Sequence, residues 1–208
     1  QVNNKIYKTI WLEDENIVKI IDQRFLPHEF VVEEIDNPLK MAEAIKEMHL
    51  RGAGLIGAAA GYGIYLSAVK NYKENRSIYE YKELIKNDIE IIRKTRPTAV
   101  NLEYAINRQL KIIESGNNTN NLLERIKKEA AAIAHLCPNM IFAENPQLIG
   151  KKVEDKDARS DIVKINEIIK NINPDIHVLH SAGIYSGKDV YDMALLGAEA
   201  TGATSGIV

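Results

Sequence analysis

A stretch of small residues in the first half of the chain constrains the fold more than any other feature. Glycine and alanine are frequent in residues 52–69, and the rest of the stretch is largely apolar. A residue without a side chain lets a neighbouring backbone approach closely, so Gly57, Gly61 and Gly63 predict tight helix contacts. The sequence therefore predicts a helix over about 55–69 that packs closely against its neighbours.

The spacing of apolar residues changes twice along the chain. Short runs of apolar residues in the first 35 residues favour an antiparallel meander of strands. From Asn37 the apolar residues recur at helical spacing. Asn37 is a plausible N-cap, with Pro38 at the first helical position. The last third alternates strands and helices, which implies parallel pairing with right-handed crossovers. The predicted strands are 6–12, 17–22, 30–35, 140–143, 176–180 and 198–203. A first helix is predicted to begin at Pro38. Further helices are predicted over 55–69, 78–94, 98–115, 121–135, 158–172 and 187–196.

These patterns predict two different architectures in one chain. Residues 1–115 are expected to form an α+β domain of antiparallel strands and a helical bundle. Residues 116–133 are expected to be a polar, asparagine-rich linker and a connecting helix. Residues 134–208 are expected to form an α/β segment of βαβαβ order, resembling part of a TIM barrel. Three parallel strands cannot close a barrel of eight, so we expect a homo-oligomer to cover the open edge.

Composition argues against several classes of protein. The net charge of −2 over 208 residues gives no reason to expect nucleic acid or an anionic membrane as partner. No apolar run approaches the roughly 20 residues that span a bilayer. Cys137 is the only cysteine, so no internal disulfide forms and a cytoplasmic setting is the expectation. We expect no metal and no cofactor. The chain starts without Met and stops at Val208, where a helix should follow.

Two arginines lie close to predicted helix starts. Arg51 is followed by Gly52 and Ala53 just before one helix, and Arg96 precedes a proline-enforced helix start. Exposed N–H groups at a helix start, beside a guanidinium, form a ready phosphate site. The same residues are also compatible with a plain helix break and solvated arginines.

A single carboxylate marks the second architecture. Glu144 ends the apolar strand 140–143, and catalytic groups of barrel enzymes lie at the carboxyl ends of such strands. Glycine-rich turns at 181–187 and 202–206 follow the next two strands and suit a phosphate cradle of backbone N–H groups. A glutamate merely exposed at a strand end remains the alternative.

Residues 7–114 resemble the N-terminal domain of the methylthioribose-1-phosphate isomerase family. This family also includes the regulatory subunits of the exchange factor for translation initiation factor two. The matching pieces are Ile20-Ile21-Asp22-Gln23 with Leu26-Pro27, Ala44 to Met48, Arg51-Gly52-Ala53, Ile56 to Gly63 and Arg96 to Leu102. The resemblance implies that Arg51, Gly52, Ala53 and Arg96 contact a sugar phosphate.

The chain departs from that family in two respects. Gly54 stands where the family usually has proline, which would loosen the turn. Nothing after residue 115 resembles the family's C-terminal domain, which carries its catalytic cysteine and aspartate. Cys137 is interpreted as a structural residue.

Residues 134–208 resemble the last strands of an archaeal-type triosephosphate isomerase. The pieces are residues 144–150, 178–184, 187–190, 196–199 and 205–208, in order. The resemblance implies that Glu144 is the general base, with the pocket lined by Ile149, Gly183, Thr204 and Ser205. The strands that carry that family's lysine and histidine electrophile are missing, and residues 151–155 replace the second half of its mobile lid.

Both resemblances predict an aldose–ketose isomerase of methionine salvage or glycolysis that acts on a small phosphorylated sugar and lacks some catalytic parts. One alternative is a non-catalytic phosphosugar-binding or regulatory module. The other is a fusion of two gene fragments with its seam at about 115–135.

Overall fold

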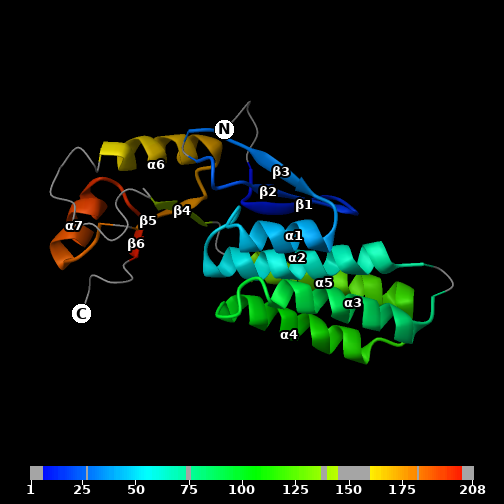
Figure 1. The fold of residues 1–208 in the computed structure, drawn as a ribbon. Helices are drawn as coiled ribbons and strands as arrows, with labels where there is room; N and C mark the ends of the chain where they lie inside the picture. The colour runs from blue at the N-terminus through cyan, green and yellow to red at the C-terminus, as the bar shows by residue number, and fades with distance from the viewer. Residues whose placement is uncertain are drawn as a thin grey trace. The chain divides into compact units, whose positions relative to one another are not determined.

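The computed structural model describes residues 7–26, 28–73, 76–136, 140–144, 160–181 and 183–202. The chain divides into two units. The helical unit comprises residues 10–24 and 31–138, and the parallel-sheet unit comprises residues 1–9, 25–30 and 139–208. Figure 1 traces the elements of each.

An antiparallel three-stranded sheet opens the helical unit, as the short alternating runs predicted. Its strands are β1 (Ile10–Asp14), β2 (Ile17–Ile21) and β3 (Val32–Ile35), in the order β1-β2-β3. Ile10 pairs with Ile20, and Val18 pairs with Ile35. All four side chains are buried, so one face of the sheet joins the core of the unit.

Five helices complete this unit: α1 (Pro38–Lys46), α2 (Ala53–Asn71), α3 (Ile78–Arg93), α4 (Val100–Ser115) and α5 (Thr119–Leu136). Helix α2 contacts the other four, and every residue from Leu55 to Ala68 is buried. A Cβ at Gly63 would lie 3.0 Å from both Met41 Cγ and Ile92 Cδ1. The tight contacts predicted for the small-residue stretch are therefore confirmed at this position.

The ends of α1 follow the sequence closely. Asn37 caps the helix, and its Oδ1 accepts hydrogen bonds from the backbone N–H groups of Leu39 and Lys40 at 3.0 Å each. The N-cap expected at Asn37 is therefore confirmed.

Helix α5 packs deep in the helical unit. Leu122, Ile126, Ala130 and Ile133 are buried in the same core cluster as α2. The domain limits expected from the sequence, 1–115, 116–133 and 134–208, stay a prediction, but in this structure α5 is part of the helical core and not only a connection.

The parallel-sheet unit has the predicted βαβαβ order. Its elements are β4 (Met140–Glu144), α6 (Ser160–Ile172), β5 (His177–Ser181), α7 (Gly187–Leu195) and β6 (Ala200–Gly202). The strands pair in parallel in the order β4-β5-β6. The comparison of this segment with a barrel stays a prediction. None of the helices in the described ranges is long and apolar enough to cross a membrane.

Candidate functional site

Among the described helices of the helical unit, α2 and α4 begin without a side-chain cap. Helices α1, α3 and α5 start beside Asn37, Ser77 and Asn118, whose side chains accept hydrogen bonds from first-turn N–H groups. The N-caps of α2 and α4 are Gly52 and Ala99, which make no such bond. The first turns of α2 and α4 therefore present N–H groups that a ligand can use.

These two helix starts line one pocket. It has a volume of about 270 Å³ and is lined by Gly54 and Gly57 of α2, Val100, Asn101 and Tyr104 of α4, and Ile133 and Leu136 of α5. A second hollow is lined by residues 97–100, Glu103, Tyr104 and Asn107, and so shares Val100 and Tyr104 with the first. The lining is largely apolar with a few polar groups, as is usual for small-molecule sites.

Arg51 lies just before α2, and its side chain carries a buried donor that has no partner among the described residues. Its Nε is buried, and no group in the described part of the chain accepts a hydrogen bond from it. A buried N–H of a charged group without an acceptor is costly, so an acceptor from outside the described residues would be stabilising there. The next residue, Gly52, has φ 102°, a conformation that residues with a side chain rarely adopt.

Arg96 also precedes a helix, but it lies three residues before Ala99, the N-cap of α4. It lies between α3 and α4 and is half-buried. Its carbonyl oxygen accepts a hydrogen bond of 3.0 Å from Ala99 N, in the turn that leads into α4. Ala53 is the first residue of α2. All four residues expected at the first site therefore lie at or shortly before the two uncapped helix starts.

Of the residues expected at the second site, the structure describes two. Glu144 is the last residue of β4 and pairs in register with Ser181 of β5. Gly183 follows β5, is buried and has φ 71°. Ile149, Thr204 and Ser205 lie outside the described residues, so the predicted pocket around Glu144 stays a prediction.

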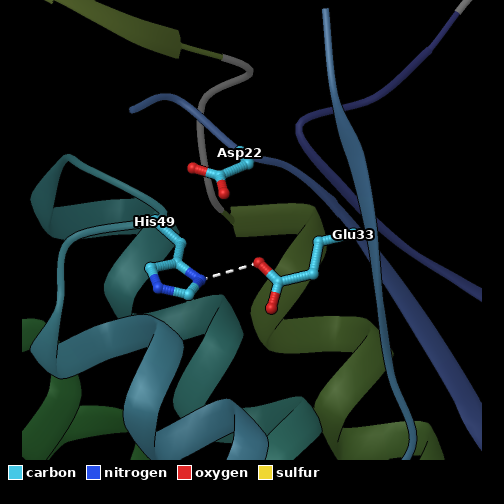
Figure 2. A group of neighbouring side chains, drawn as sticks. All are labelled: Asp22, Glu33 and His49. Atoms are coloured by element: carbon cyan, nitrogen blue, oxygen red, sulfur yellow. Dashed lines mark hydrogen bonds and ion pairs between the residues drawn. The ribbon is translucent and has the colours of Figure 1, made fainter. Parts of the chain in front are cut away.

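Two carboxylates and an imidazole lie together where the residue after β2, strand β3 and the segment between α1 and α2 meet. Asp22, Glu33 and His49 each offer a ligand atom, and these atoms lie within 4.8 Å of one another. Figure 2 shows the Glu33 carboxylate facing the His49 ring, with 2.7 Å between Oε2 and Nδ1. Residues of these types are common metal ligands.

The side-chain atoms of this group that could bind a metal ion already make hydrogen bonds within the protein. The Arg24 guanidinium binds both Asp22 carboxylate oxygens at 2.6–3.2 Å. Burial opposes ionisation of Asp22, but the hydrogen bonds from Arg24 outweigh it, so the Asp22 pKa lies below its usual value. An ion would have to displace Arg24 from Asp22 and His49 from Glu33, so the group fits an internal polar network better than a metal centre.

Sequence reasoning named Asp22 only within a motif and did not single out Glu33 or His49. The signal for that pair is weak because the two residues lie 16 positions apart and meet only once β3 and the segment after α1 are packed. The sequence likewise did not indicate Tyr104, Ile133 and Leu136 as pocket residues, because they lie far along the chain from the start of α2 and meet it only in the folded protein.

Comparisons with known proteins place most of the chain in one family. Residues 49–181 match the model of the Initiation factor 2 subunit family. The match runs through α5, β4 and β5, so similarity to this family extends past residue 115, where no resemblance to its C-terminal domain was expected.

Several curated relatives are named methylthioribose-1-phosphate isomerase. Methylthioribose-1-phosphate isomerase of a Thermoanaerobacter strain is 40% identical over 131 residues, which are 62% of this chain and 37% of that protein. The enzyme of the same name from Crocosphaera subtropica is 45% identical over 125 residues, or 60% of this chain and 34% of the relative. The chain thus spans little more than a third of the length of these relatives.

Solved structures of other proteins are also similar to this chain. Methylthioribose 1-phosphate isomerase from Pyrococcus horikoshii superposes with a TM-score of 0.59 at 39% identity, covering 64% of this chain and 37% of that one. Translation initiation factor eIF-2B subunit delta from A. fulgidus gives 0.57 at 23% identity, covering 98% of this chain and 62% of the other. The second likeness concerns the fold alone. None of these relatives is a triosephosphate isomerase.

Proposed function

The chain belongs to the Initiation factor 2 subunit family, and from this membership we propose that it binds a phosphorylated sugar at the starts of α2 and α4. The relatives with 40–45% identity are named for an isomerase of methylthioribose 1-phosphate, so an aldose–ketose isomerase of methionine salvage is the activity we propose for the whole protein.

One observation carries the binding proposal: two uncapped helix starts, each closely preceded by an arginine, line the same pocket. The positive ends of two helix dipoles favour an anion at this place. Arg51 adds a guanidinium whose buried Nε has no acceptor among the described residues, and a phosphate oxygen would supply one.

The apolar walls fit the rest of such a ligand. Val100, Ile133 and Leu136 contribute aliphatic surface, and Asn101 and Tyr104 can bind hydroxyl groups. We therefore assign phosphate contacts to Arg51, Gly52, Ala53 and Arg96, and the organic part of the ligand to the pocket.

The test compares arginine variants in phosphate binding. Inorganic phosphate is titrated into the full chain, and the backbone N–H signals of Gly52 and Ala53 are followed by NMR. Because hydrogen bonds to charged groups contribute about 1.5–3 kcal/mol, Arg51→Ala should weaken binding by about tenfold or more. Arg96→Ala should weaken it as well.

Arg93→Ala is the matched control. It also removes one positive charge, but the Arg93 guanidinium is already bound to Glu90 and Glu103. If the wild type, Arg51→Ala and Arg96→Ala bind phosphate with equal affinity, the proposed phosphate site is wrong. Turnover of methylthioribose 1-phosphate that is lost in Arg51→Ala supports the isomerase, and binding without turnover supports the non-catalytic binding module.

The resemblance of residues 134–208 to triosephosphate isomerase gives a second, weaker proposal. It rests on Glu144 and Ser181 lying side by side at the carboxyl ends of β4 and β5, with Gly183 at φ 71° following. Conversion of glyceraldehyde 3-phosphate that disappears in Glu144→Gln supports this reading, and no conversion by the wild type opposes it. The homo-oligomer also stays a prediction.

A further inference from the structure

The segment between α1 and α2 presents Arg51, and one residue in it is held from three sides. The backbone N–H of His49 donates to the carbonyl of Ala44 at 3.0 Å, at the end of α1. The carbonyl of His49 accepts a 2.7 Å hydrogen bond from Gln23 N, just after β2. The ring Nδ1 lies 2.7 Å from Glu33 Oε2, on β3. Three separate elements thus fix this residue.

The ring contact is partly sheltered from solvent. His49 is 7% exposed and the Glu33 side chain is 29% exposed, so water reaches the hydrogen bond mainly from the Glu33 side. Glu33 comes from the edge strand of the antiparallel sheet, and the two side chains face each other across the space between β3 and the end of α1 (Figure 2). The contact ties the sheet to the chain just before Arg51.

In the described part of the chain, no side chain anchors Arg51 in this way. Its Nε has no hydrogen-bond acceptor among the described residues, and Gly52 after it has no side chain to hold the turn. The direction of the guanidinium and of the first N–H groups of α2 must therefore be set by the backbone that leads into them. That backbone is fixed at His49, two residues earlier.

We propose that His49, through its hydrogen bond with Glu33, is a positioning residue for the anion site formed by Arg51 and the start of α2. The proposal rests on the proposed function, because it assigns His49 a task only if that site binds an anion. His49 does not touch the ligand. It holds the turn so that a phosphate meets preorganised donors, which lowers the cost of ordering them on binding.

Two substitutions at one position separate the hydrogen bond from the shape of the side chain. His49→Asn keeps a nitrogen near the place of Nδ1, whereas His49→Phe keeps a planar ring without a donor. Glu33→Leu removes the partner. The full chain of each variant is titrated with inorganic phosphate, with the N–H signals of Gly52 and Ala53 as reporters. Thermal unfolding is measured in parallel.

A loosened turn should weaken phosphate binding by about fivefold in His49→Phe and Glu33→Leu, while His49→Asn stays within about twofold of the wild type. Ser67→Ala is the control for stability. It removes the 2.7 Å hydrogen bond from Ser67 Oγ to Asp88 Oδ2 between α2 and α3, away from the turn. This variant should unfold at a lower temperature and bind phosphate like the wild type at about 20 °C, well below unfolding.

The results separate the two proposals. If Arg51→Ala loses binding while His49→Phe binds like the wild type, the positioning role is wrong and the anion site stands. If His49→Asn and His49→Phe lose affinity equally, the hydrogen bond with Glu33 is not the cause, and the proposal also falls. If phosphate moves neither the Gly52 nor the Ala53 signal in the wild type, both proposals are wrong.

Discussion

A Cβ placed on Gly57 of α2 would lie 3.0 Å from the backbone carbonyl oxygen of Asn101 in α4. Both residues line the pocket, so this backbone contact sets the distance between the two uncapped helix starts. The neighbouring atom belongs to a helix backbone and cannot rotate away as a side chain would. The small residue at position 57 therefore links the packing of α2 to the geometry of the proposed site.

Gly57→Ala should consequently destabilise the helical unit. The methyl group would force α4 away by a few tenths of an ångström, at a cost of about 1–3 kcal/mol, and the better helix propensity of alanine recovers only part of this. Urea unfolding followed by circular dichroism measures the difference. Gly61→Ala, in the same helix, is the control, because its nearest contact would be an ordinary 3.4 Å to Ile133 Cδ1. Equal stability of both variants would contradict the prediction.

Met48→Gly should stabilise the chain. Met48 follows the end of α1 with φ 59°, in the left-handed region that side chains disfavour, and 40% of the residue is exposed. Glycine removes the steric cost of about 1–2 kcal/mol but loses more entropy on folding, so the expected net gain is roughly 0.5–1 kcal/mol. Chemical denaturation measures it. Met48→Ala should show no gain, since alanine keeps the Cβ, and a gain in that variant would contradict the explanation.

His180 should make the parallel-sheet unit sensitive to acid. The side chain is 2% exposed, its Nε2 lies 2.8 Å from Asn166 Oδ1, and burial lowers its pKa from 6.5 to about 4. The unfolded chain therefore takes up a proton at higher pH than the folded chain does. The contribution of the neutral His180 to the free energy of unfolding is fully present above pH 6.5. It is lost as the pH drops towards 4, which lowers the free energy of unfolding by up to roughly 3 kcal/mol.

Hydrogen exchange of the β5 amides between about pH 4.5 and 7 measures this loss. After correction for intrinsic exchange rates, the protection of the β5 amides should depend less on pH in His180→Gln than in the wild type. The variant should be less stable than the wild type near neutral pH. His28→Gln changes an exposed histidine of the same unit and should leave the dependence as it is. An unchanged pH dependence in His180→Gln would contradict the prediction.

Several elements could be read directly from local sequence. The cap at Asn37, the break at Arg51-Gly52 and the small residues of α2 each follow from the properties of a few neighbouring residues, and the structure agrees with them. The same holds for the alternation of strands and helices after residue 140. Backbone propensity and apolar spacing act over short distances, so one sequence is sufficient to detect them.

The remaining features depend on contacts between residues far apart in the chain. The sequence shows arginines near two helix starts, but only packing brings α2 and α4 to one pocket and adds Ile133 and Leu136 from α5 to its wall. Tertiary structure likewise pairs Glu33 with His49 and leaves the Nε of Arg51 without an acceptor in the described part of the chain. Local sequence thus determined the elements and the candidate anion-binding residues. Long-range packing decided which of them meet, because burial and hydrogen bonding act on groups that only the fold brings together.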